Sequence, residues 1–349
     1  MKVWRRMRLR TTIVTLLSGA CGGGRLPPHM AALRSVCDEV QQGGYRPPKQ
    51  FDVGYCDDYS IGNWLSVYYA LVAVADVNST IDMTCQSTEP PHLAFPPRVR
   101  GQGSFDPRAF CTKSVCQLYP HVCPHPLPEA IPFIHFHMWY HARHSGLYDE
   151  TMSEEVVIHF RCAADVVLER RPDYGIMQFA DYERTIPPDA AVIRILSPPE
   201  KRCSRGSGAQ CMVASDLCGV LRRRLADRIT AVSPRARLVD DHESSVATAL
   251  VRLTMARVTF CASSTFCIFP ALAARHGVIA KSSLNRWVAT NSSYLKPAVW
   301  WQHGPEVAAD IVSFSTIASA LASAEGSEGI ARVVDLIAPN FTNATARRR

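Results

Sequence analysis

The sequence predicts an α/β protein built from two Rossmann-like domains that face one cleft. Short apolar strands alternate with helical patterns along most of the chain, and in each half one strand runs into polar residues suited to a ligand. The chain has 349 residues, more than one hydrophobic core usually serves. We therefore expect about two domains of ~100–200 residues each.

The first residues have the pattern of a targeting segment. Basic residues come first, the apolar stretch Thr11–Leu17 follows, and Ser18–Ala20 supplies the small side chains of a cleavage site. We expect residues 1–26 to be a signal peptide, with a short signal anchor or a wrongly assigned start codon as alternatives. The apolar run is shorter than the ~20 residues of a membrane span. Residues 27–50 are punctuated by Pro and Gly, which indicates a stem or linker.

The N-terminal domain is predicted over residues 51–150. A strand over 51–55 leads into a helix that Gly62 and Asn63 open, and a second strand follows over 81–85. A Gly-Asn turn lets the backbone approach a ligand closely, although an ordinary connection from strand to helix has the same pattern.

The rest of this domain is less regular. Prolines and cysteines exclude long elements between residues 86 and 130, and the apolar residues 131–135 then predict another strand. Histidines follow at short spacing, and His-x-His on a strand would place both rings on one face, as a metal site requires. We favour exposed histidines without a metal, because no acid joins them before Asp149. The histidines are His135, His137, His141 and His144.

The C-terminal domain, predicted over residues 151–300, begins with the stretch that organises the fold. The β-branched residues 156–158 predict a buried strand, and His159 and Arg161 come where that strand ends. Being two apart, they project to the same side of an extended backbone. The guanidinium of Arg161 can hold phosphate oxygens through two bonds, whereas a surface ion pair is the alternative.

A second strand of this domain runs into hydroxyl residues. Residues 258–261 form a short apolar run, which predicts a strand. Ser263, Ser264 and Thr265 follow where the N-cap of an apolar helix is expected. Hydroxyl groups and N–H groups of a first helical turn can bind phosphate, while capping without a ligand is the alternative.

The remaining pattern completes the domain. A strand over 237–241 ends in Asp240 and Asp241, which either contact a base or ribose or are solvated loop acids. The C-terminal region 301–349 contains an Ala-rich helix from 305 to about 324. Further helices are predicted over 179–184, 213–229 and 246–255, and further strands over 190–196 and 278–281.

The two strand ends resemble those of the GT-B fucosyltransferase superfamily, the α1,2-, α1,6- and protein O-fucosyltransferase-like enzymes. That family has His-x-Arg-x-Gly-Asp at a strand end, a later Ser-Ser/Thr-Phe turn before a helix, and a Gly-x-x-Gly-Asn-type turn at its first helix. The order is kept here, but Ala163-Ala164 replaces the Gly and adds one residue before the Asp. The matching residues are His159, Arg161, Asp165, Ser264, Thr265, Phe266, Gly62 and Asn63.

The resemblance implies a metal-independent glycosyltransferase with GT-B architecture that takes fucose from GDP-fucose and uses no cofactor. Arg161 would stabilise charge on the leaving diphosphate, and the other matching residues would hold the donor. The N-terminal domain would face the acceptor, a glycan or glycoprotein, and the C-terminal helix would cross back to that domain. The catalytic base is not identified.

Cysteine usage and charge bear on location and partners. Thirteen cysteines, mostly paired, agree with the oxidising secretory pathway, the Golgi or ER lumen, and the odd number leaves at least one free or removed with the leader. Zinc is the competing interpretation, but the chain has no Cys-x-x-Cys pair. The net charge of +7 comes from scattered arginines, so we expect no nucleic-acid partner. Acceptor sequons for glycosylation occur at Asn78, Asn291, Asn340 and Asn343.

Two rival functions remain open. One is a catalytically silent glycan- or nucleotide-binding relative, which the altered Ala163-Ala164 segment favours. The other is a disulfide-rich secreted structural or metal-binding protein built on the cysteine and histidine clusters. Binding of GDP would distinguish a silent nucleotide-binding relative from a structural protein. Hydrolysis of GDP-fucose would distinguish an active enzyme from a silent relative.

Overall fold

The structure is a computed structural model of the chain, which divides into two compact units. One unit comprises residues 1–90 and 95–130, and the other comprises residues 91–94 and 131–349. The predicted leader, the predicted stem as far as residue 49, Asn63 and the four sequons lie outside the described residues. The described residues are 50–52, 62, 65, 69, 80–82, 98–100, 131–168, 170, 174–197, 208–281, 306–323 and 327–339.

The first unit contains a small sheet. Its strands are β1 (Gln50–Asp52), β2 (Thr80–Asp82) and β3 (Arg98–Arg100). β1 and β2 are parallel, and β2 and β3 are antiparallel. Between β1 and β2, Gly62, Leu65 and Tyr69 are helical and buried, as expected for a helix that connects parallel strands. β3 lies in the region predicted to be irregular, because its pairing with β2 rather than a sequence pattern creates it.

The second unit is built on a six-stranded sheet in the order β10-β9-β8-β4-β6-β7, and every neighbouring pair is parallel. The strands are β4 (Glu155–His159), β6 (Val192–Leu196), β7 (Arg237–Asp241), β8 (Val258–Cys261), β9 (Gly277–Ala280) and β10 (Glu306–Ala309). The three strands that come first along the chain occupy one half of the sheet, and the three later strands occupy the other half. This is the strand order of dinucleotide-binding Rossmann domains.

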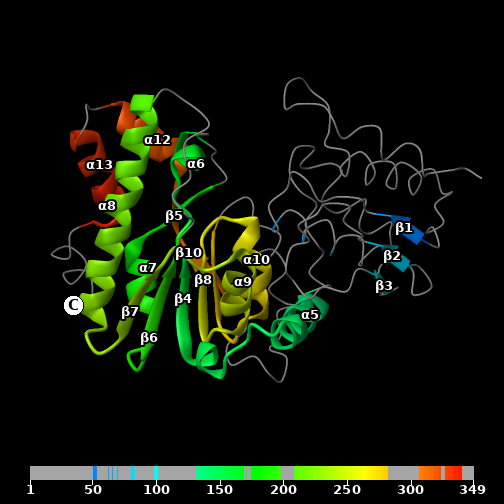
Figure 1. The fold of residues 1–349 in the computed structure, drawn as a ribbon. Helices are drawn as coiled ribbons and strands as arrows, with labels where there is room; N and C mark the ends of the chain where they lie inside the picture. Colours follow the sequence, from blue (N-terminus) through cyan, green and yellow to red (C-terminus); the bar gives the residue numbers. More distant parts are fainter. Residues whose placement is uncertain are drawn as a thin grey trace, which may run out of the picture. The chain divides into compact units, whose positions relative to one another are not determined.

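Helices cover both faces of this sheet (Figure 1). One layer contains α9 (Val246–Met255) and α10 (Thr265–Ala273), and α5 (Ile131–His144) packs against both. The opposite layer consists of α6 (Ala164–Leu168), α7 (Phe179–Thr185), α8 (Gly208–Val232), α12 (Phe314–Ala322) and α13 (Ser327–Ile337). A short 3-10 helix, η4 (Glu150–Glu154), precedes β4. The result is a Rossmann-like α/β domain.

The core explains why the strands form where they do. Every residue of β4 and β8 is buried, which is why both read as continuous apolar runs rather than alternating ones. On the opposite layer, α8 buries a stripe at four-residue spacing against the sheet. The stripe consists of Leu217, Leu221, Leu225 and Ile229.

Two predicted elements are wrong. Residues 131–135 are not a strand but the first turns of α5, where Pro132 is tolerated in the first turn. The reason is a buried stripe, Ile134, Met138 and Ala142, which packs the helix on its neighbours.

The predicted helix from residue 305 is also wrong in its first part. Its first residues form β10, which completes the sheet beside β9, and then β11 (Ile311–Ser313), which pairs antiparallel with β5 (Gly175–Met177). Only the remainder is helical, as α12, which packs against α6 and α13 in the same unit. An open edge on β9 outweighs the helical propensity of alanine there.

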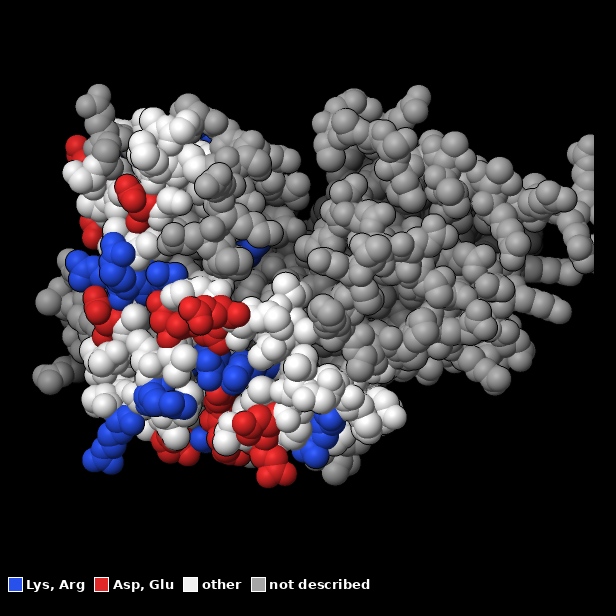
Figure 2. Space-filling model, in the orientation of Figure 1, with Lys and Arg blue, Asp and Glu red and all other residues white. Residues whose placement is uncertain are grey.

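The surface of the second unit carries charges of both signs. On the face drawn in Figure 2, basic and acidic side chains are interspersed among uncharged ones. Such a mixture is typical of a solvated protein surface. Among the described residues, no helix is both long enough and apolar enough to cross a membrane.

Candidate functional site

The candidate site lies at the carboxyl ends of β4 and β8. These strands are neighbours, and their last residues His159 and Cys261 are paired in the register. The chain leaves β4 toward β6 on one side, whereas it reaches β8 on the other side only after β7. In Rossmann-like sheets, ligands bind at the point where the connections leave in opposite directions.

His159 forms the β4 side of the site. It is the last residue of β4 and only 6% exposed, and its Nδ1 atom has no hydrogen-bond partner among the described residues. Burial, and secondarily the nearby charge of Arg161, lowers the pKa of His159 to about 3, so the imidazole is neutral at pH 7. A buried polar atom without a partner is unusual, and this nitrogen is free to form one hydrogen bond to a bound group. Arg161 follows two residues later and is partly exposed.

The N-terminus of α10 forms the β8 side. Ser264 is its N-cap, and the hydroxyl oxygen accepts a hydrogen bond from the backbone N–H of Phe266 at 3.3 Å. Ser263, Ser264 and Thr265 are all buried. The ring of Phe266 lies 5.3 Å from the ring of His159, centroid to centroid, so the two sides of the site meet. A helix N-terminus attracts anions through its dipole and its N–H groups.

Each side of the site carries a disulfide. Cys162, next to Arg161, is bonded to Cys218 on α8, and Cys261 is bonded to Cys267 in the first turn of α10. Cys211 is also disulfide-bonded. All cysteines of the described part of the chain are therefore in disulfides.

The structure brings together five of the residues that the sequence singles out. They are His159, Arg161, Ser264, Thr265 and Phe266. Asp165 lies in α6, and only its place in that helix is described. Gly62 is a buried helical residue of the first unit, and Asn63 lies outside the described residues.

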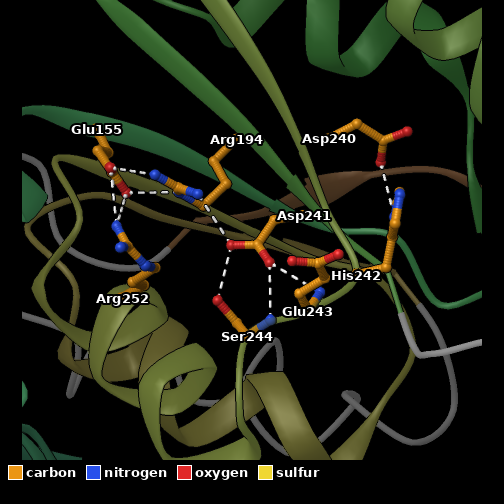
Figure 3. Close-up of polar contacts among 8 residues, drawn as sticks. All are labelled: Glu155, Arg194, Asp240, Asp241, His242, Glu243, Ser244 and Arg252. Carbon is orange, nitrogen blue, oxygen red and sulfur yellow. Dashed lines mark hydrogen bonds and ion pairs between the residues drawn. The ribbon is translucent and has the colours of Figure 1, made fainter.

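A buried charge network that the sequence analysis did not predict joins β4, β6, β7 and α9 (Figure 3). Glu155, at the start of β4, accepts hydrogen bonds from Arg194 of β6 at 2.9 and 3.1 Å. Arg252 of α9 donates to the same carboxylate at 2.9 and 3.0 Å. The network ties α9 to the middle of the sheet, and its role is to hold the scaffold. Charged residues scattered over several elements give no local signal, so only the fold could reveal it.

The acids of β7 have different surroundings. Asp241 accepts hydrogen bonds from Arg194 at 2.9 Å and from the backbone and hydroxyl of Ser244 at 2.9 and 2.7 Å. Although burial opposes the shift, these bonds hold the pKa of Asp241 below its usual value. Asp241 is thus occupied by protein donors, which argues against a ligand contact. Asp240 is 40% exposed in its side chain and lies 3.3 Å from His242 (Figure 3).

The histidine cluster lies on α5 rather than on a strand. The Nε2 atoms of His137 and His141, one helical turn apart, are 2.8 Å from each other, and both residues are buried. His135 contacts the carbonyl of Leu272 through Nδ1 at 3.3 Å. Burial is the main reason why the pKa of His137 is lowered to about 3. Within the described ranges, no three His, Cys, Asp or Glu side chains form a group that could hold a metal.

Comparisons with protein-family models, with curated proteins and with solved structures found no match to this chain.

Proposed function

We propose that the second unit binds the diphosphate of a nucleotide sugar at the carboxyl ends of β4 and β8, and that the protein is a fucosyltransferase using GDP-fucose. One observation carries the proposal. At the switch point of a Rossmann-ordered sheet, the strand that leads to Arg161 meets the capped N-terminus of α10. A cation and a helix N-terminus beside one crevice suit a diphosphate.

The chemistry of sugar transfer explains the residue types. When the bond between the sugar and the diphosphate breaks, negative charge develops on the phosphate oxygens. Arg161 supplies a fixed positive charge, and the dipole of α10 adds partial positive charge from the other side. His159 is neutral and buried, so its unpartnered nitrogen can accept or donate one hydrogen bond without adding charge.

The GT-B arrangement and the cellular location belong to the same proposal. The first unit would supply the acceptor side, with a glycan or glycoprotein as acceptor, and transfer would need no metal ion. Disulfides at the site support an oxidising compartment such as the Golgi or ER lumen.

The test is a panel of nucleotides and nucleotide sugars in thermal shift and calorimetry on the full chain. We expect GDP and GDP-fucose to raise the melting temperature, and ADP and UDP to raise it little. Slow hydrolysis of GDP-fucose should then continue in excess chelator. Loss of hydrolysis in chelator with recovery in manganese would contradict the metal-independent mechanism.

A silent relative is the second candidate, and the Ala163-Ala164 departure favours it. α6 begins at Ala164, so this departure lies where the chain passes from the site into a helix. Tight GDP binding with neither hydrolysis nor transfer would support the silent relative. Absence of any nucleotide binding would instead favour a disulfide-rich structural protein.

A further inference from the structure

We propose that the Cys261–Cys267 disulfide positions the phosphate-binding turn, so that donor binding depends on the oxidised state of this pair. The inference rests on the proposed function and specifies how its site is held. The two disulfides that join described cysteines lie at the two loops of the switch point. Both therefore act on the loops that form the proposed site.

The disulfide encloses the turn itself. Cys261 ends β8 and is the register partner of His159, and Cys267 is the third residue of α10. The bond closes a ring around residues 262–266, which include the N-cap Ser264. Both sulfur-bearing residues are fully buried, so the bond is part of the core rather than a surface clip.

The turn also contains the N-cap of α10, and residues 262–265 are buried. Ser264 has an extended backbone, with φ −155° and ψ 131°, and its hydroxyl makes a 3.3 Å contact with the N–H of Phe266. Three residues, 262–264, connect β8 to α10, and without the ring they would have more conformational freedom, which a ligand would have to remove on binding. A turn that is already fixed avoids that cost, which is how preorganisation raises affinity.

The other disulfide acts on the facing loop. Cys162 directly follows Arg161, and its bond to Cys218 fixes this point of the loop to α8, although 56 residues separate the two cysteines. The guanidinium therefore extends from a backbone that is held in place. Reduction by a dithiol would convert each disulfide to two thiols and the dithiol to its own disulfide, and each loop would lose its covalent tie.

The experiment compares GDP affinity with stability in full-length variants. C261S/C267S should bind GDP at least about tenfold more weakly than wild type in calorimetry well below its melting temperature, because the loosened turn must be ordered. If transfer is measured, the KM for the donor should rise more than kcat falls. A control, Leu225→Ala, removes a fully buried side chain of α8 remote from the turn and should leave the affinity within about twofold.

The outcomes separate the two claims. If wild type binds GDP and C261S/C267S binds it within about twofold, the disulfide is only structural and the inference is wrong, while the proposed function stands. If wild type binds no nucleotide, both fall. Should C261S/C267S fail to fold, C261A/C267V fills the buried space with apolar groups and faces the same criterion.

Discussion

Arg161 is the residue on which donor binding depends most in the proposed function. It follows the end of β4, is partly exposed, and contributes no side chain to the core. Replacing it by Ala should remove two charge-assisted hydrogen bonds, each of about 1.5–3 kcal/mol. We expect GDP affinity to fall on the order of a hundred- to ten-thousand-fold, with Arg161→Lys recovering little because an ammonium cannot make the forked contact.

The matched control is Arg275→Ala. Arg275 is exposed near the amino end of β9, and its guanidinium lies 3.7 Å from the carboxylate of Glu154. The site lies at the other end of the strands, at their carboxyl ends. Its loss should change neither melting nor GDP affinity, since an exposed pair at that distance contributes little. Normal GDP binding by Arg161→Ala, measured on protein that melts like wild type, would refute the role given to this arginine.

A second prediction for a single residue concerns the contribution of Tyr182 to stability. It is fully buried between Phe179 and Phe260, and its hydroxyl has no hydrogen-bond partner among the described residues. Burial raises the pKa of the phenol, so it stays neutral. Because an unpaired buried hydroxyl is costly, Tyr182→Phe should leave the free energy of unfolding unchanged or raise it by up to about 2 kcal/mol. A loss of more than about 1 kcal/mol in denaturant unfolding would reveal a partner for the hydroxyl.

At the scale of elements, the contact of β9 with α10 tolerates no side chain at Gly277. A Cβ built there would lie 1.9 Å from the carbonyl oxygen of Ala271, a backbone atom that cannot rotate away. Gly277→Ala should therefore separate the strand from the helix and lower the free energy of unfolding by about 3 kcal/mol or more. Chemical denaturation measures the loss.

Gly208, the first residue of α8, provides the control. A Cβ there would meet nothing within 4 Å, so Gly208→Ala should leave stability unchanged or raise it by up to about 1 kcal/mol through helix propensity. Equal losses for the two substitutions would show that the contact with Ala271 does not decide the outcome.

At the scale of the whole molecule, buried neutral histidines should make the protein sensitive to acid. Burial is the main cause that lowers the pKa of His135 to about 4 and those of His137 and His159 to about 3, from 6.5. The unfolded chain therefore binds more protons than the folded one below pH 6.5. Stability is full above that pH and is lost as the pH falls toward 3. At pH 5 each histidine should cost about 2 kcal/mol.

Thermal melting between pH 7 and pH 5 tests this expectation. The melting temperature should fall, and in His159→Gln it should fall less than in wild type, by about 4–8 °C for the ~2 kcal/mol that one histidine contributes in a unit of this size. Identical pH profiles for wild type and His159→Gln would mean that His159 is not held neutral in the folded state.

The sequence by itself determined the elements whose pattern is local. The β-branched run of β4 and the apolar run of β8 identify buried strands, and the helix predicted over 246–255 coincides with α9. Ser264 was identifiable as an N-cap, because a hydroxyl residue between a strand and an apolar run has that role wherever it occurs. Cys261 and Cys267 flank the same turn, but spacing alone does not determine disulfide connectivity.

Only the tertiary structure decided which strands are neighbours and which charges meet. The order that places β8 beside β4 depends on contacts between residues about a hundred apart, for which no local pattern exists. The predictions for the residues of α5 and β10 were wrong for the same reason. Packing on α10 makes an Ile- and Phe-rich run helical, and pairing with the edge of β9 makes an Ala-rich run a strand. Glu155, Arg194 and Asp241 likewise become one network only when three strands are laid side by side. Propensity is a weak local preference, and burial of a shared surface overrides it.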